Sequence, residues 1–308
     1  MEMHQLTYFE SVSRHLHFTR AAEELNVAQP SVSQQIRKLE NELGAPLFHR
    51  MKRHVALTEA GKLFLPHARA VLQRIEEARL EVQELSGLRK GTLAVGAPPS
   101  VGTHLLPRAL ASFSHRHPGI TLSFREAGSR TLLSLLEAGE LDLAVVIQPI
   151  RHPALETFPL LEEELLLATP RAHPLASGHQ RRVRLTQLRD EPFVLLREGA
   201  YDLRDQTLAA CRRAGFEPNV ALDGGEMDSM LRFVAAGIGV AILPEMVLSD
   251  VGPRDGAVAV RRLQPRLSRA LVIARRRDRY FSAAARTFAT VLERSAGLRT
   301  ASADEHGD

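Results

Sequence analysis

Length, composition and charge exclude several protein classes. The chain has 308 residues, a hydrophobic content of 44% and a formal net charge of +4, which suits two or three globular units and not a low-complexity or fibrous protein. Its single cysteine cannot form an intramolecular disulfide, and no apolar run reaches the roughly 18 residues that a membrane-spanning helix needs. We therefore expect a cytoplasmic protein without a membrane partner.

The first sixty residues predict three short helices. Apolar residues at helical spacing indicate a helix over residues 4–15, and a second helix follows in "RAAEELN" with Thr19 as its expected N-cap. Pro30 fits the first turn of a third helix, where its missing N–H costs nothing, and Gly44 ends that helix. Two short helices joined by a tight turn, the second polar on its outer face, are typical of a helix-turn-helix.

The outer face of the third helix carries side chains that suit nucleic acid. Glutamine pairs with adenine in the major groove, arginine pairs with guanine or phosphate, and serine binds phosphate oxygens. The next segment, "PLFHRMKRHVALTEAG", indicates two short strands around a basic turn, which would form a wing beside the helix. An ordinary helical domain with a polar face is the alternative. The residues of this face and wing are Gln29, Ser31, Ser33, Gln34, Arg37, Arg50, Lys52 and Arg53.

The segment "FTRAAEELNVAQPSVSQQIRKLENELGAPLFHRMKRHVALTEAG" resembles the N-terminal signature of the LysR-type transcriptional regulators, and the resemblance extends from Leu6 to Gly61. It implies a winged helix-turn-helix over residues 1–58, double-stranded DNA as the partner, and RNA polymerase as a further candidate partner. It also implies which residues contact DNA. Gln29, Pro30, Ser33, Gln34 and Arg37 would lie at the major groove, and Thr19, Arg20, Arg50 and Arg53 would lie near phosphates or the minor groove.

Residues 58–86 predict one long helix. Apolar residues recur every three or four positions from Leu57 to Leu85, and Thr58 is the expected N-cap. A long amphipathic helix needs a partner for its apolar stripe, and a second copy of the chain would pair two DNA-binding units. Packing against the chain's own C-terminal part is the alternative. LysR-type relatives use this segment, here residues 59–88, for dimerisation, which implies a homodimer or homotetramer.

Residues 89–296 predict a two-lobed α/β domain, which makes the fold class α + α/β. Strands and helices alternate in the order βαβαβ, with one helix expected over Val101–Arg116, and a second α/β unit follows. The resemblance implies an effector-binding domain like that of periplasmic binding proteins, with lobe one at 92–162 plus 268–296 and lobe two at 163–267. Residues 297–308 predict a disordered tail.

Small molecules bind to such folds between the lobes, at the carboxyl ends of the strands. Ser100 and the N–H groups that follow it occupy one such end, and Ser129 follows the next strand as the expected helix cap. Each serine could equally act only as an N-cap. The positions favour a small anionic or hydroxylated effector. The expected effector-binding residues are Ser100, Val101, Gly102, Ser129, Ile147, Gly199, Asp202 and Glu226.

An enzyme of this size needs a recognisable site, and the sequence contains none of the common motifs. It has no GxSxG, no P-loop, no HExxH and no paired Cys/His spacing for a metal. We therefore expect no catalytic residues, no metal and no cofactor. A small-molecule-binding enzyme is the alternative. A stand-alone solute-binding protein would explain the two lobes but not the first ninety residues.

The stretch "YDLRDQTLAAC" ends with the only cysteine, Cys211. Its LRDQ segment, residues 203–206, is similar to that of OxyR, the peroxide sensor of the same family, which has one cysteine immediately before LRDQ and another after it. Here Asp202 takes the first position, and we expect it to cap a helix over residues 203–214. Two hypotheses remain for Cys211, a packed core thiol or a single-cysteine oxidant sensor that acts through sulfenic acid.

Overall fold

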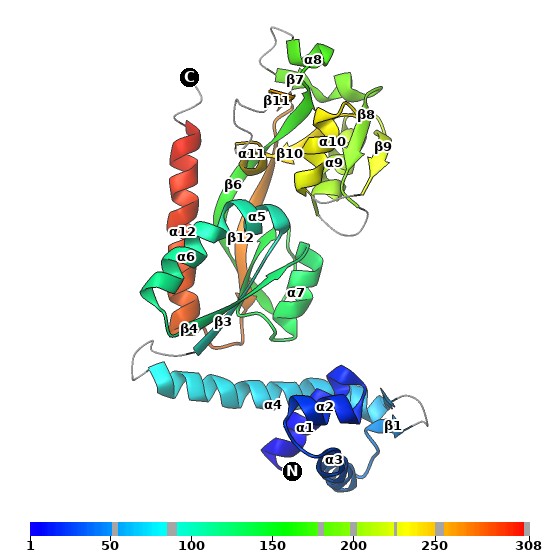
Figure 1. Ribbon diagram of the computed structural model, residues 1–308, viewed down its shortest axis with the longest axis vertical. Helices are drawn as coiled ribbons and strands as arrows, with labels where there is room; N and C mark the ends of the chain where they lie inside the picture. Colours follow the sequence, from blue (N-terminus) through cyan, green and yellow to red (C-terminus); the bar gives the residue numbers. More distant parts are fainter. Residues whose placement is uncertain are drawn as a thin grey trace. The chain divides into compact units, whose positions relative to one another are not determined.

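The computed structural model of the chain divides into two compact units, Met1–Ser86 and Gly87–Asp308 (Figure 1). It describes residues 1–50, 55–84, 91–177, 182–197, 202–224, 227–249 and 256–304. Within these ranges, no helix is both long enough and apolar enough to cross a membrane.

The N-terminal unit is a winged helix-turn-helix followed by a long helix. Its elements are α1 (Met3–His15), α2 (Phe18–Glu24), α3 (Gln29–Leu43), β1 (Phe48–Arg50), β2 (Val55–Leu57) and α4 (Glu59–Glu84). The strands of the wing are antiparallel, with Phe48 opposite Leu57. The fully buried Phe9 has its ring centroid 5.4 Å from that of Phe48 and 5.3 Å from that of Phe64. One side chain of α1 therefore packs against both the wing and the long helix.

Short sequence signals set the ends of these elements. Gly44 follows α3 with a φ of 71°, a conformation that glycine adopts without steric cost. The Thr58 hydroxyl accepts a hydrogen bond from the Gly61 N–H at 3.0 Å, which confirms Thr58 as the N-cap of α4. The predicted N-cap of α2 is wrong, because the His17 ring accepts the N–H groups of Thr19 and Arg20. The buried Phe18 is the first residue of α2, so the cap position falls on His17.

Glu24 connects α2 to α1 near the surface of the unit. Its carboxylate accepts hydrogen bonds from the Ser11 hydroxyl at 2.9 Å, the Arg14 guanidinium at 2.6 Å and the His15 ring at 2.7 Å. The hydrogen bond from Arg14 is the main reason that the pKa of Glu24 falls to about 2; burial opposes the shift, and His15 and Ser11 reinforce it. The ionised form of Glu24 therefore stabilises the folded unit.

We expect Glu24→Gln to lower the free energy of unfolding of the N-terminal unit by about 1 kcal/mol at neutral pH, because solvent screens a partly exposed ion-pair network. The folded-state pKa is depressed, so this stabilisation is present above pH 4.5 and is lost as the pH falls towards 2. Urea denaturation of both proteins over that pH range measures it, with Glu23→Gln at the neighbouring exposed carboxylate as the control. If the difference in unfolding free energy between Glu24→Gln and the wild type stayed constant as the pH fell, the prediction would be contradicted.

Lobe one of the C-terminal unit has a parallel βαβαβ arrangement. Its elements are β3 (Gly91–Ala97), α5 (Pro99–His104), α6 (Leu106–Arg116), β4 (Ile120–Glu126), α7 (Ser129–Glu137) and β5 (Leu143–Ile147). β3 lies between β4 and β5 and pairs in parallel with both. The single helix expected over Val101–Arg116 is wrong, because two helices meet at Leu105. Pro107 lacks the N–H that a continuous helix would direct at the Thr103 carbonyl, so the helix breaks there.

Two long antiparallel strands, β6 (Leu155–Pro170) and β12 (Leu267–Arg276), connect lobe one to lobe two. β12 pairs with β5 of lobe one, whereas residues 165–170 of β6 pair with β10 and β11 of lobe two. The sheet order β4-β3-β5-β12-β6-β11-β7 therefore continues from one lobe into the other (Figure 1). The remaining elements of lobe two are α8 (Pro174–Ser177), β7 (Arg182–Arg184), the 3-10 helix η1 (Leu185–Leu188), β8 (Pro192–Leu195), α9 (Asp202–Arg213), β9 (Asn219–Asp223), α10 (Met227–Ala235), β10 (Ala241–Pro244), α11 (Glu245–Leu248) and β11 (Val258–Gln264).

The last helix, α12 (Ala283–Asp304), packs on lobe one. Its Phe288 ring lies 5.5 Å from the Phe113 ring of α6, and both side chains are fully buried. The helix continues to Asp304, so the disordered tail predicted from residue 297 is wrong for 297–304, and residues 305–308 lie outside the described part of the chain. Residues 297–304 contain one glycine and no proline, so nothing in their composition forces the helix to stop.

Candidate DNA-binding surface and effector site

The two faces of α3 differ sharply in polarity. Val32, Ile36 and Leu39 are fully buried in the core of the N-terminal unit, so the opposite face of the helix turns outwards. The exposed residues on α3 include the predicted contact residues Gln29, Pro30, Ser31, Gln34 and Arg37. The Ser33 hydroxyl is half-buried and accepts a hydrogen bond from the Gln29 amide at 2.8 Å. The helix thus presents the amide, hydroxyl and guanidinium groups that contacts with base edges and phosphates require.

The wing is attached to α3 by a carboxylate that the sequence analysis missed. Glu40 of α3 accepts hydrogen bonds from the backbone N–H groups of Leu47 at 2.9 Å and Phe48 at 3.3 Å. Arg50 is the last residue of β1, and the predicted contact residue Arg53 lies outside the described residues. The other two predicted phosphate contacts, Thr19 and Arg20, are exposed in the first turn of α2.

A buried ion pair joins the two lobes near the start of α5. The Arg269 guanidinium of β12 lies 2.6 Å from the Glu163 carboxylate of β6, and their exposed fractions are only 2% and 6%. Arg269 also donates a hydrogen bond to the Ser100 hydroxyl at 2.9 Å, and Glu163 accepts one from the Met246 N–H of lobe two at 3.0 Å. Ser100, predicted as an effector contact, is therefore buried in a charged network.

A second contact between the lobes involves Ser129 and Asp202. The Ser129 N–H, at the start of α7 in lobe one, donates a hydrogen bond to the Asp202 carboxylate of lobe two at 3.2 Å. The Ser129 hydroxyl accepts a hydrogen bond from the Ile147 N–H at 3.0 Å, which places three predicted effector residues together. We refer to Ser100, Ser129, Glu163, Asp202 and Arg269 as the interlobe junction.

Two expected capping roles at the junction are wrong. Gly128 is the N-cap of α7, and Ser129 is the first residue within the helix, so its hydroxyl is directed to Ile147 instead. Asp202 does not precede its own helix but is the first residue of α9, and its carboxylate accepts the N–H at the start of α7. A partner 73 positions away replaces the local partner that the sequence suggested.

Two further predicted effector residues, Val101 and Gly102, do not join the junction. The Val101 side chain is fully buried in the core. The N–H groups of Val101 and Gly102 donate to the Pro98 carbonyl at 3.0 and 2.9 Å, so the expectation that they hold an anion is wrong. Gly199 and Glu226 lie outside the residues that the structure describes.

Comparison with protein families shows which family this chain belongs to. Residues 3–62 match the bacterial regulatory helix-turn-helix protein, lysR family, and residues 86–297 match the LysR substrate binding domain. The chain belongs to the LysR family of transcriptional regulators. It has the architecture of that family, an N-terminal helix-turn-helix and a C-terminal two-lobed α/β domain, as predicted.

Similar proteins support the same assignment for the LysR regulator. The HTH-type transcriptional regulator YybE of Bacillus subtilis is 34% identical over 288 residues, which cover 94% of this chain and 97% of YybE. A full-length OxyR from Pseudomonas aeruginosa with a cysteine-to-aspartate substitution matches with a TM-score of 0.77 and 29% identity over 97% of this chain and 95% of OxyR. CbnR in complex with its target DNA matches with a TM-score of 0.66 and 26% identity over 96% of this chain and 100% of CbnR.

Cys211 of the LysR regulator is a core residue of α9. Its side chain is fully buried, and burial, with a smaller contribution from Glu217, raises the pKa of the thiol to about 11. Oxidation by peroxide requires an accessible thiolate, and this environment disfavours the thiolate and shields it. The geometry therefore supports the packed-thiol hypothesis over the oxidant-sensor hypothesis.

Arg269 and Glu163 are functional candidates that the sequence analysis of the regulator missed. A signal for Arg269 exists in "LSRALVIA", where it occupies the same side of the strand as the buried Leu271 and Ile273. An arginine at an inward strand position requires a buried anion. The sequence could not show which of the three consecutive glutamates at 162–164 supplies that anion.

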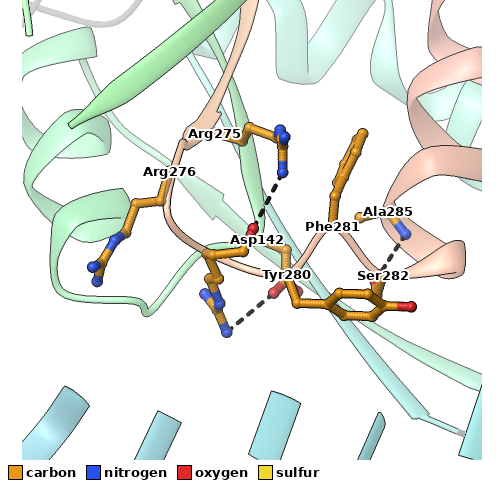
Figure 2. Close-up of a pocket in the computed structure, with 8 residues that line it drawn as sticks. Asp142, Arg275, Arg276, Tyr280, Phe281, Ser282 and Ala285 are labelled. Carbon is orange, nitrogen blue, oxygen red and sulfur yellow. Dashed lines mark hydrogen bonds and ion pairs between the residues drawn. The ribbon is translucent and has the colours of Figure 1, made fainter. Parts of the chain in front are cut away.

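A small pocket lies at the amino end of β5, whereas Ile147, which bonds to the junction residue Ser129, lies at the carboxyl end of that strand. Figure 2 shows the pocket between Asp142, which precedes β5, and the turn that leads into α12. Arg279 pairs with Asp142 at 3.3 Å and donates to the Gly139 and Leu141 carbonyls, while Arg276 donates to the Glu137 carbonyl. These arginines bind the C-terminal end of α7, so the pocket has a structural explanation in the regulator.

Proposed function

We propose that this LysR-family regulator binds double-stranded DNA with α3 in the major groove and the wing beside it. The observation that carries the proposal is the polar, exposed face of α3 opposite a fully buried apolar face. Glutamine and arginine at these positions suit direct contacts with base edges. The similarity to CbnR, whose structure contains its target DNA, supports the same use of the fold. The proposed contacts are Thr19, Arg20, Gln29, Pro30, Ser31, Ser33, Gln34, Arg37, Arg50 and Arg53.

The proposed assembly is a homodimer or homotetramer that pairs through α4. Three apolar side chains on this helix, Leu63, Val71 and Val82, are 73%, 47% and 66% exposed. A stripe of this kind on a long helix favours pairing with a second helix. A dimer would present two copies of α3 to two half-sites on the DNA.

The proposed effector site is the interlobe junction. Ser100 and Ser129 are buried at the carboxyl ends of neighbouring parallel strands, and each bonds to a residue of another element. A molecule that hydrogen-bonds there would change the contacts between the lobes, and it would regulate DNA binding by its differential affinity for two arrangements. We propose a cytoplasmic regulator without catalytic activity. The contact with RNA polymerase stays a prediction.

Fluorescence anisotropy with DNA from upstream of the regulator's own coding sequence tests the proposal. We expect Gln34→Ala to weaken binding by about tenfold or more, because a bidentate contact with adenine contributes roughly 1–3 kcal/mol. Arg37→Ala is expected to weaken binding similarly and to reduce its salt dependence. Arg79→Ala removes one charge from an exposed position of α4 and serves as the matched control. Equal losses in all three variants, or binding that salt does not affect, would contradict the proposed surface.

A further inference from the structure

The N-terminal end of α7 already binds a carboxylate that belongs to the chain itself. The N-cap of this nine-residue helix is Gly128, which has no side chain to accept the N–H groups at the helix start. The half-buried Asp202 of lobe two supplies that acceptor, with its Oδ2 3.2 Å from the Ser129 nitrogen. Because the helix dipole favours negative charge at this end, Asp202 occupies the position that the carboxylate of a bound molecule would otherwise take.

The other positive group of the junction is also neutralised. The Arg269 guanidinium bonds to both the Glu163 carboxylate, at 2.6 and 2.8 Å, and the Ser100 hydroxyl. Of the arginines next to the junction in sequence, Arg130 and Arg197 have exposed side chains, and Arg204 is paired with Asp223 at 2.7 Å. Among the described residues of the junction, therefore, Asp202 neutralises the positive end of the α7 dipole, and Glu163 neutralises the Arg269 guanidinium.

We propose that Asp202 is a specificity-determining residue, which excludes carboxylate effectors from the interlobe junction and selects uncharged polar molecules. A carboxylate placed between Ser100 and Ser129 would approach the carboxylates of both Glu163 and Asp202 and would be repelled. An uncharged molecule with hydroxyl or amide groups would meet the two serine hydroxyls without that repulsion. The inference rests on the proposed effector site, and it narrows the expected ligand class from anionic or hydroxylated to uncharged.

Replacing Asp202 with alanine tests this assignment, because a soluble carboxylate can then take the vacated position. In the full-length chain, acetate is titrated while the amide resonances of Ser129 and its neighbours in α7 are followed by NMR. In Asp202→Ala we expect a saturable acetate-dependent shift at Ser129. In the wild type we expect acetate to bind at least about tenfold more weakly, since the side-chain carboxylate holds the favourable end of the helix dipole. Acetamide, the uncharged isostere, should act equally on both proteins.

The matched control is Asp205→Ala, because Asp205 is an exposed carboxylate on the same first turn of α9. It removes the same charge and should behave like the wild type. An Asp202→Ala protein without an acetate shift at Ser129, or a wild type that binds acetate as tightly as the variant, would overturn the proposal. Anisotropy with DNA in the same samples separates the two ideas. If the wild type binds DNA but one of these two acetate results is found, only the proposed role of Asp202 is rejected. If the wild type does not bind DNA, the proposed function itself is contradicted.

Discussion

Replacing Arg269 with methionine is expected to lower the free energy of unfolding of the C-terminal unit by about 3–5 kcal/mol, because Glu163 then remains as a buried, uncompensated charge. The two buried residues lie directly opposite each other on β6 and β12, the strands that connect the lobes. The substitution also removes the donor to the Ser100 hydroxyl. The chain contains no tryptophan, so far-ultraviolet circular dichroism in urea is the suitable measurement.

Two further variants show whether the buried charge causes this loss. Glu163→Met combined with Arg269→Met removes both charges, and its free energy of unfolding should return to within about 1–2 kcal/mol of the wild-type value. Arg266→Met alters an arginine that is 58% exposed and 3.9 Å from Glu164, and it should cost about 0.5 kcal/mol or less. If Arg269→Met were as mild as Arg266→Met, the pair would not be the buried ion pair described above.

Local signals in the sequence predicted the N-terminal unit well. Pro30 at the start of α3, Gly44 at its end and Thr58 as the cap of α4 each act on backbone groups within four residues. Such interactions are readable because both partners appear in the same short segment. The α2 cap was the exception, since a histidine ring took a role that threonine fills more often.

The junction between the lobes was only partly predictable. The ends of β3 and β4 directed attention to Ser100 and Ser129, because parallel strands place their carboxyl ends at one edge of a sheet. Their partners were not predictable, since Arg269 is 169 positions from Ser100 and Asp202 is 73 positions from Ser129. The spacing of residues along the sequence does not reveal pairs that are so far apart. The capping roles inferred for Ser129 and Asp202 from local sequence were therefore wrong.

Replacing Phe9 with alanine should produce the largest loss in the N-terminal unit, about 3–5 kcal/mol of unfolding free energy, since a fully buried aromatic ring leaves a cavity. The ring packs against Phe48 of the wing and Phe64 of α4, so the loss affects the wing as well as the helices. We expect this unit to unfold at a lower temperature in the variant, and we expect DNA binding to be lost above that temperature. Met3→Ala, at a 49% exposed position of the same helix, should change the unfolding free energy by no more than about 0.5 kcal/mol.

The effect of Phe9→Ala on the other unit tests how the chain is divided. The contacts of the Phe9 ring lie within Met1–Ser86, and Gly87–Asp308 has a separate hydrophobic core. The transition of the C-terminal unit should therefore stay at its wild-type temperature while that of the N-terminal unit falls. Differential scanning calorimetry resolves the two events, and Arg269→Met should show the reverse pattern. If both transitions fell together in each variant, the two units would unfold as one cooperative structure, and an effector at the junction could act on α3 through shared stability as well as through geometry.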